Sequence, residues 1–286
     1  MPHNIKLIEC PRDAMQGWKE PIPTSKKVQY INTLLQVGFD TIDFGSFVSP
    51  RLIPQMADTK EVVKQLKPGN SSTKLLAIVA NTRGADEAST FDEISCLGFP
   101  FSISETFQQR NANSTILEAL DRVEEIQDIC IKKGKQLVVY ISMAFGNPYG
   151  DEYSPEILYE WVKKIASLDV SIISLADTVG VAEAENVNSM TGFLVDLLPD
   201  IEIGVHLHST LQNWKDKVQA AFYAGCRRFD GALKGIGGCP MAGDVLVGNM
   251  NTGLMINYFN DLSLLPPLNN EALQHSLDLA DDIFKH

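Results

Sequence analysis

Residues 136–175 read QLVVYISMAFGNPYGDEYSPEILYEWVKKIASLDVSIISL, and this stretch decides the fold. It opens with an apolar run rich in β-branched residues, Gln136–Ser142, and closes with a second one, Ser171–Leu175. Between them, Pro155–Ser167 carries apolar residues at the spacing of an amphipathic helix. A strand, a helix and another strand in this order predict two parallel strands joined by a helical crossover.

The same unit repeats along the whole chain. The predicted strands are Ile5–Glu9, Thr41–Phe44, Lys74–Val79, Phe99–Ile103, Gln136–Ser142, Ser171–Leu175, Glu202–His206 and Arg227–Asp230. The predicted helices are Thr24–Val37, Pro54–Leu66, Gly84–Ser95, Thr115–Lys133, Pro155–Ser167, Glu183–Leu197, Leu211–Ala224 and about Leu246–Tyr258. Unbroken repetition predicts an α/β fold, a (β/α)8 TIM barrel in a single domain over residues 1–286, with Asn270–His286 as an extra C-terminal helix. A doubly wound open sheet is the alternative, because a strand count does not prove closure.

The composition of the chain argues against nucleic-acid-binding, membrane and secreted proteins. Of the 286 residues, 44% are hydrophobic and 21% charged, and the formal net charge is −12. Such an acidic surface repels phosphate backbones, so we expect no nucleic-acid partner. No run approaches the roughly 18 apolar residues of a membrane helix, and the first residues do not resemble a signal peptide. Five widely spaced cysteines without a CxxC pair indicate free thiols. We therefore expect a soluble, cytoplasmic protein.

Candidate metal ligands follow the first and seventh predicted strands, at the end where such barrels carry their chemistry. Arg12 and Asp13 set a permanent cation beside a carboxylate, although a plain turn is the alternative interpretation. His206 and His208 are two residues apart on a strand, so both imidazoles point the same way. Together with Asp13 they form an N,N,O set that suits Mg²⁺ or Mn²⁺.

Further candidates lie in the loops after other strands. Cys239 ends a glycine-rich loop, and it is either a reactive thiol above the barrel mouth or an inert, half-buried residue. Asn249 is either a helix N-cap or another carbonyl ligand of the metal. Asp43 and Asp177 follow the second and sixth strands, and each could orient Arg12 or a metal ligand, or simply stabilise its loop.

Several short motifs resemble those of 3-hydroxy-3-methylglutaryl-CoA lyases. They are PRDAMQ (11–16), SFVSP (46–50), PQM (54–56), SETFQ (104–108), DTVG (177–180), HLH (206–208) and GGCP (237–240), in the order of that family. The resemblance extends from Glu9 to about Thr252. It implies a metal-dependent barrel that cleaves 3-hydroxy-3-methylglutaryl-CoA to acetyl-CoA and acetoacetate, and that forms a homodimer.

The resemblance also implies roles for individual residues. The metal ligands would be Asp13, His206, His208 and Asn249. Arg12 would stabilise the developing enolate, and Cys239 would be the acid or base on a mobile loop. The residues near the acyl-CoA substrate would be Gln16, Ser46 and Tyr149. Asp43 and Asp177 are counted with the catalytic residues.

The sequence departs from the family pattern around this centre. Asp43 stands where the family usually has glutamate, and Ser209 replaces an acidic residue after the second histidine. The stretch 211–213 lacks a usual glycine, and Gly253 stands where the family carries glutamate. The loop from Cys239 to Asn249 is one residue longer. These changes leave a related 3-hydroxyacyl-CoA open as the substrate.

Three alternatives to the lyase remain. A Claisen-type condensing enzyme or aldolase of the same superfamily would act on a 2-oxo acid, but its first strand usually ends in an Asp-Thr-Thr-Leu-Arg-Asp type of motif. A metal hydrolase barrel normally carries its paired histidines after the first strand, not the seventh. A catalytically silent barrel that acts as a binding protein is the third, since function belongs to sites rather than to folds.

Overall fold

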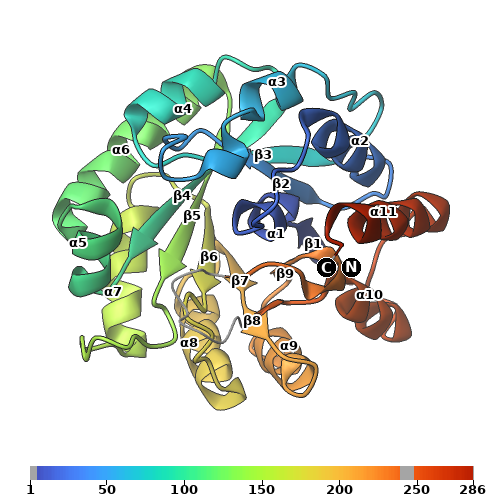
Figure 1. The fold of residues 1–286 in the computed structure, drawn as a ribbon. Coiled ribbons are helices and arrows are strands. Elements are labelled where there is room, and N and C mark those ends of the chain that lie inside the picture. Colours follow the sequence, from blue (N-terminus) through green and yellow to red (C-terminus); the bar gives the residue numbers. More distant parts are fainter. Residues whose placement is uncertain (1–4, 239–247, 286) are drawn as a thin grey trace.

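The protein is described here from a computed structural model that covers residues 5–238 and 248–285 (Figure 1). Eight parallel strands close into a barrel. They are β1 (Lys6–Glu9), β2 (Thr41–Ser46), β3 (Lys74–Ile78), β4 (Ile94–Ser102), β5 (Gln136–Ser142), β6 (Ile172–Ala176), β7 (Glu202–His206) and β9 (Arg228–Gly231). The last strand, β9, pairs with β7 on one side and with β1 on the other. This closure confirms the predicted (β/α)8 barrel and excludes the open sheet.

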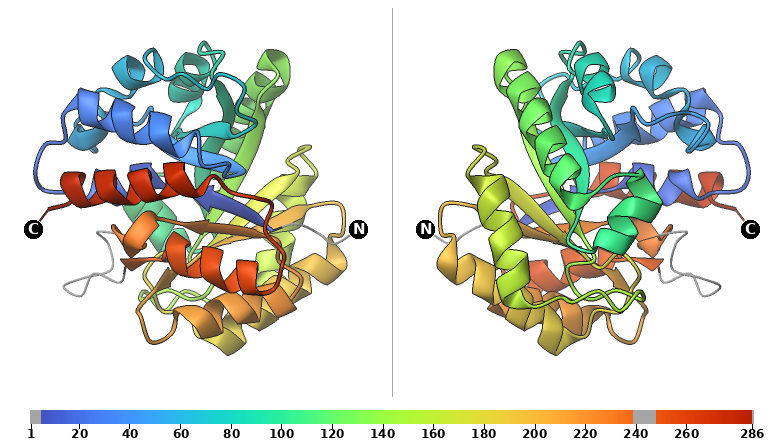
Figure 2. Two further views of the ribbon diagram at one scale, coloured as in Figure 1. Left: turned by 90° about the vertical axis from the view of Figure 1, so that its right-hand side faces the viewer. Right: turned by 90° about the vertical axis from the view of Figure 1, so that its left-hand side faces the viewer.

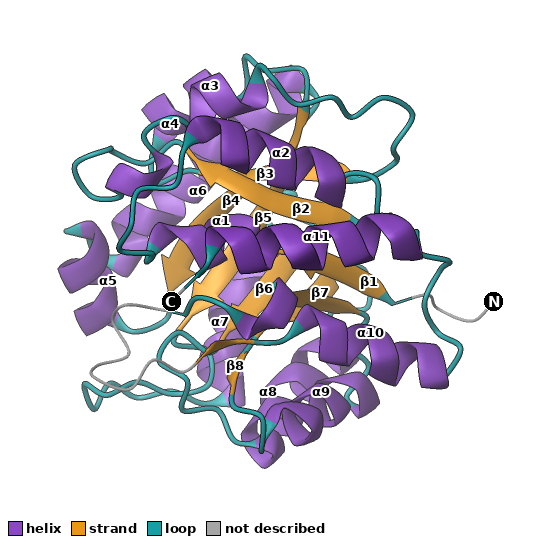
Figure 3. Cartoon of the chain, turned by 45° about the vertical axis from the view of Figure 1, so that its right-hand side comes forward, coloured by secondary structure: helices purple, strands orange, loops and turns teal. Residues whose placement is uncertain are grey.

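Helices surround the barrel on its outside (Figure 3). They are α1 (Pro11–Gln16), α2 (Thr24–Leu34), α3 (Thr59–Val63), α4 (Thr82–Ala88), α5 (Glu105–Ala112), α6 (Ile116–Lys133), α7 (Pro155–Ala166), α8 (Ala184–Leu197), α9 (Trp214–Tyr223), α10 (Thr252–Asp261) and α11 (Asn270–Ile283), with 3-10 turns η1 (Pro54–Met56) and η2 (Leu233–Gly235). The predicted C-terminal helix is α11, which packs beside α2 (Figure 2). Among the described residues, no helix combines the length and the apolar character needed to cross a membrane.

The strand β5 shows why these sequences form a barrel. Every residue from Leu137 to Ser142 is buried, because one face of the strand points into the barrel and the other meets the helices. Val138 and Tyr140 belong to a small buried cluster with residues of β3, β4 and β6. Their neighbour Val139 belongs to the large cluster between strands and helices. Alternation along the strand therefore separates the barrel interior from its outer layer.

The helix α6 begins and ends where its sequence predicts. Thr115 and Glu118 form a reciprocal capping box at its start. Gly134 ends it in the left-handed conformation, at φ 65°.

The region between β3 and β4 differs from the prediction. The helix predicted over Gly84–Ser95 ends already at Ala88, and the strand predicted from Phe99 begins at Ile94. Ile94 pairs with Leu75 of β3, so its short apolar run joins the sheet rather than the helix. The ladder hydrogen bonds of the barrel override the local helical spacing there.

Several short elements were not predicted. The interpretation of Arg12-Asp13 as a plain turn is wrong, because Pro11 begins the helix α1, where its missing N–H costs nothing. The helix α5 is also new, and the predicted helix over Pro54–Leu66 is split into η1 and α3. Beyond the barrel, β8 (His208–Ser209) and β10 (Gly248–Asn249) form a separate antiparallel pair. The helix predicted from about Leu246 begins at Thr252, and its first predicted residues lie outside the described part of the chain.

Candidate active site

Arg12 lies at the carboxyl end of the barrel, in the helix α1 that directly follows β1, and its side chain is buried. Its Nε donates to Oδ2 of Asp43, a residue of β2, at 3.0 Å. Its Nη1 donates to Asp13 Oδ1 at 2.8 Å and to Gln16 Oε1 at 2.9 Å. Burial opposes the charged form of Arg12, but the charges of Asp43 and Asp13 raise its pKa. The guanidinium is therefore a fixed cation, and Asp43 does contact it.

Two imidazoles lie next to this cation, at the end of β7 and the start of β8. The rings of His206 and His208 are 5.5 Å apart between centroids and nearly perpendicular. His206 Nε2 is 4.0 Å from Asp13 Oδ2, and its Nδ1 is 3.2 Å from Asp230 Oδ2. Burial would lower the pKa of His206, but the hydrogen bond with Asp230 and the charge of Asp13 raise it. Each nitrogen of His206 thus faces a different carboxylate.

Asn249 is brought to the same place by the β8–β10 pair, in which it lies opposite His208. Its Nδ2 donates to the carbonyl of Ile236 at 2.9 Å. The alternative role as a helix N-cap is wrong, because Asn251 caps α10 through its own side chain. The side chain of Asn249 is therefore available to the site.

Three buried polar atoms of this group have no hydrogen-bond partner among the described residues: Asp13 Oδ2, His208 Nδ1 and Asn249 Oδ1. Buried polar atoms are nearly always paired, so such a cluster needs an explanation. Burial alone would raise the pKa of Asp13, but Arg12 and the two histidines lower it to about 2, which makes it an anionic ligand. Two oxygens and two imidazole nitrogens fit a divalent cation of the Mg²⁺ or Mn²⁺ type.

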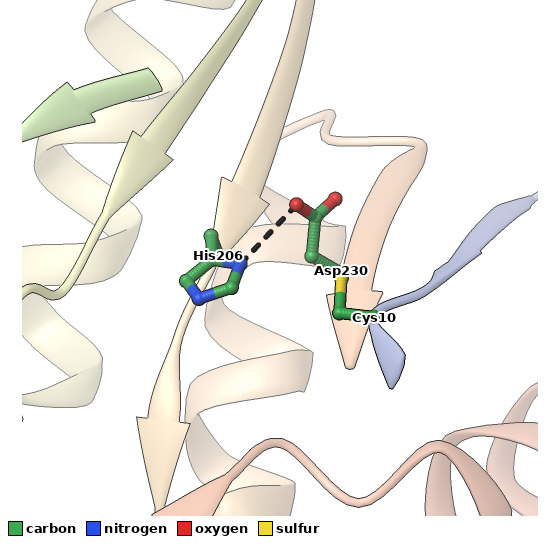
Figure 4. A group of neighbouring side chains, drawn as sticks. All are labelled: Cys10, His206 and Asp230. Atoms are coloured by element: carbon green, nitrogen blue, oxygen red, sulfur yellow. Dashed lines mark hydrogen bonds and ion pairs between the residues drawn. The ribbon is translucent and has the colours of Figure 1, made fainter. Parts of the chain in front are cut away.

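A second group of possible ligands lies beside the first. Single ligand atoms of Cys10, His206 and Asp230 lie within 4.8 Å of one another (Figure 4). Burial and the charges of Asp230 and Asp43 raise the pKa of Cys10 well above its usual value, so it stays a neutral thiol. Because Mg²⁺ and Mn²⁺ prefer oxygen ligands to thiols, this group is the poorer site for such an ion. Asp230 instead contacts Nδ1 of His206, the ring nitrogen that does not face Asp13.

For Asp177 the sequence left open a contact with Arg12 or a metal ligand, or a role in stabilising its loop, and the structure shows an ion pair and a loop contact. Oδ2 of Asp177 forms a buried ion pair with Lys217 at 3.0 Å, and its Oδ1 accepts from the Ala182 N–H. Lys217 also donates to the carbonyl of His208 at 2.8 Å. Asp177 therefore supports the backbone of His208 through Lys217, and no contact with Arg12 is found among the described residues.

The predicted substrate residues are not all in one place. Gln16 lies beside Arg12 and donates to Asp13 Oδ1 at 2.8 Å. Ser46 is buried at the end of β2, where its Oγ accepts from the Val48 N–H. Tyr149 is stacked on Phe107 and under Arg110, and none of its described contacts reaches Arg12 or the histidines. Cys239 lies outside the described residues.

Two buried charged residues of the site, Asp230 and Lys217, were not predicted from the sequence. Asp230 ends the eighth strand, so the reasoning applied to Asp43 and Asp177 would have found it. Lys217 is a lysine on the inner side of α9, next to Val218. A charged residue at a core position of an amphipathic helix was the available signal.

Comparisons with known proteins agree on one family. A family model described as HMGL-like matches residues 4–279. The chain is 32% identical to the cytoplasmic 3-hydroxy-3-methylglutaryl-CoA lyase of Danio rerio, over 92% of this chain and 78% of that protein. It is also 32% identical to the mitochondrial hydroxymethylglutaryl-CoA lyase of Mus musculus, over 99% of this chain and 86% of that protein. A solved HMG-CoA lyase from Acinetobacter baumannii, in complex with coenzyme A and 3-methylmalate, superposes with a TM-score of 0.91 at 28% identity, over 100% of this chain and 93% of that one.

Proposed function

The chain belongs to the HMGL-like family, and from that we propose that it is a carbon–carbon lyase that cleaves 3-hydroxy-3-methylglutaryl-CoA to acetyl-CoA and acetoacetate. The observation that carries the proposal is the group of unpartnered atoms Asp13 Oδ2, His208 Nδ1 and Asn249 Oδ1, placed beside the cation Arg12. A related 3-hydroxyacyl-CoA remains the second candidate substrate.

Cleavage between C2 and C3 requires that the C3 hydroxyl lose its proton and that the thioester take up the electron pair as an enolate. A divalent cation held by Asp13, His206, His208 and Asn249 would act as a Lewis acid on the substrate oxygens. The charge that develops on the thioester oxygen is the part of the reaction assigned to Arg12.

The contacts of Arg12 suit this task. Of its five N–H donors, one on Nε and one on Nη2 bind Asp43, and the two on Nη1 bind Asp13 and Gln16. One N–H on Nη2 remains without a partner among the described residues. A guanidinium that is held by Asp43, Asp13 and Gln16 and has one free N–H can donate to an enolate oxygen without reorganising.

For the remaining residues we propose the roles that the resemblance to the lyase family implies. Cys239 would return a proton to the enolate and so complete acetyl-CoA. Gln16 and Ser46 would line the acyl end of the substrate, and Tyr149 would lie farther out on the rim. We further propose Mg²⁺ or Mn²⁺ as the metal, one catalytic domain over residues 1–286, a homodimer, and a cytoplasmic location.

The test is metal-dependent turnover by the purified protein. After chelator treatment, we expect no acetoacetate from 3-hydroxy-3-methylglutaryl-CoA, and we expect equal amounts of acetoacetate and acetyl-CoA once Mg²⁺ or Mn²⁺ is added. Asp13→Asn should remove this activity, whereas the matched control Asp200→Asn, at an exposed position before the start of β7 and so at the opposite end of that strand from His206, should keep it. Absence of turnover with either metal would refute the proposal, and other 3-hydroxyacyl-CoAs and 2-oxo acids would then be screened.

A further inference from the structure

A row of buried polar side chains lies inside the barrel at the junction of β7 and β9. Gly204 pairs with Arg228, and His206 pairs with Asp230, two residues farther along both strands. Because strand side chains alternate between faces, these four residues share one face. The alternate residues Val205 and Phe229 belong to the large cluster between strands and helices, whereas His206 contacts Tyr140 of the small interior cluster, so this face is the barrel interior. The row leads directly to His206.

Arg228 is held at the opposite end of the row from His206. Its Nη1 lies 3.3 Å from Glu202 and 3.6 Å from Asp40. Gly204 leaves the space for its side chain, since a Cβ there would lie 2.9 Å from Arg228 Cδ. Burial opposes the charged form of Arg228, but the charge of Asp230 is the first of those that raise its pKa. Arg228 is thus a cation on the same face as Asp230, two residues before it, but no direct contact joins them: Arg228 Nε, Arg228 Nη2 and Asp230 Oδ1 have no hydrogen-bond partner among the described residues.

Asp230 lies between Arg228 and the candidate metal site along this face and contacts His206 of that site. Its Oδ2 is 3.2 Å from His206 Nδ1, and Figure 4 shows the carboxylate directed at the imidazole. The other nitrogen, Nε2, faces Asp13 Oδ2. A carboxylate that accepts from Nδ1–H fixes both the tautomer and the rotation of the ring, and it leaves the lone pair of Nε2 free to bind a metal.

We propose that Asp230 is a positioning residue that holds His206 through Nδ1, so that Nε2 is presented beside Asp13 as a metal ligand, with Arg228 as the countercharge of Asp230. The inference deepens the proposed function and rests on it for the presence of a metal. It assigns Asp230 to the support of the ligand and not to the ligand set itself.

The first test is the Mn²⁺ affinity of the purified protein, measured by calorimetry on Asp230→Ala and Asp230→Asn. Loss of such a supporting partner lowers metal affinity by about 10–100-fold. We expect this loss in Asp230→Ala, and a smaller one in Asp230→Asn, whose amide oxygen can still accept from Nδ1–H. Asp40→Asn is the matched control, because it removes another acidic neighbour of Arg228 and Asp40 makes no contact with His206 among the described residues. It should stay within about threefold of the parent.

The second test reads the tautomer of His206 in metal-free protein, by nitrogen NMR of histidine-labelled samples at an alkaline pH, where the imidazole is neutral. The chain has 5 histidines, and a His206→Gln variant identifies the signals of interest. We expect the proton on Nδ1 in the parent, and a shift of the proton toward Nε2 in Asp230→Ala. A merely structural role of Asp230 would not change the tautomer.

Three results would overturn the inference. One is a folded Asp230→Ala protein that both binds Mn²⁺ within threefold of the parent and keeps the parent's tautomer of His206. Another is a parent protein with the proton on Nε2. The third is loss of Mn²⁺ binding in Cys10→Ala, which would mean that the metal is held by Cys10, His206 and Asp230. A parent protein that follows the expected affinities without cleaving 3-hydroxy-3-methylglutaryl-CoA would refute the proposed function alone.

Discussion

Glu9, at the end of β1, is a buried acid whose replacement by glutamine should change how stability depends on pH. Its side chain is 0% exposed. Oε1 accepts from the Leu233 N–H at 2.8 Å, and Oε2 lies 2.6 Å from Thr252 Oγ1. Burial raises the pKa of Glu9 from 4.5 to about 8, although these two hydrogen bonds lower it. Glutamine has the shape of the protonated acid and can make both contacts.

The sign and size of the effect follow from these pKa values. Between pH 4.5 and about 8, the folded protein binds a proton at Glu9 that the unfolded chain releases. The free energy of unfolding therefore falls as the pH rises through this window, and the full loss is reached above the folded pKa. A pKa difference of about 3.5 corresponds to about 5 kcal/mol. Glu9→Gln should match the parent near pH 4.5 and exceed its stability by up to about 5 kcal/mol near pH 8.5.

The assay is urea unfolding of metal-free parent and variant proteins at pH 5, 7 and 8.5, followed by circular dichroism. Glu185→Gln is the matched control, since Glu185 is exposed. Its difference from the parent should be small at every pH. If the stability difference between Glu9→Gln and the parent is the same at pH 5 and pH 8.5, the argument from burial is wrong.

Three further predictions concern the site. Arg12→Gln should lower turnover by about 10²–10³-fold while Mn²⁺ still binds, measured by steady-state kinetics and calorimetry; unchanged turnover would remove Arg12 from the chemistry. Lys217→Met should lower the free energy of unfolding, measured in urea, by about 3–5 kcal/mol, because the Asp177 carboxylate stays buried without its cation. The double variant Lys217→Met, Asp177→Asn should recover part of this loss. A cost under about 1 kcal/mol would contradict that role. Mn²⁺ at 100 times its Kd should stabilise the parent by about 2.7 kcal/mol and Asp13→Asn much less, in thermal unfolding; equal stabilisation would place the ion elsewhere.

The architecture could be predicted because several barrel strands are buried on both faces and therefore form nearly continuous apolar runs, as in residues 137–141. The error between β3 and β4 has a physical cause. Ile94 and Ser95 continue the helical spacing of the preceding segment, and only pairing with β3 assigns Ile94 to the sheet. The short pair of β8 and β10 could not be predicted for the same reason, since two-residue strands carry no periodicity.

The site was predicted in part, because a strand end fixes where a side chain lies but not what it contacts. The sequence placed Asp13 and His206 at one end of the barrel, and their side chains do face each other. It did not distinguish Asp43, which contacts Arg12, from Asp177, which instead pairs with Lys217. That distinction depends on Lys217, whose core position on α9 marks a buried charge but does not show which carboxylate it pairs with.

The ion-binding group is tested most directly by a crystal structure of the Mn²⁺-soaked protein, in which anomalous scattering locates the metal. We expect one peak within bonding distance of Asp13 Oδ2, His206 Nε2, His208 and Asn249, with Asp230 hydrogen-bonded to Nδ1 of His206. A peak between Cys10 and Asp230, or none near Asp13, would contradict this expectation.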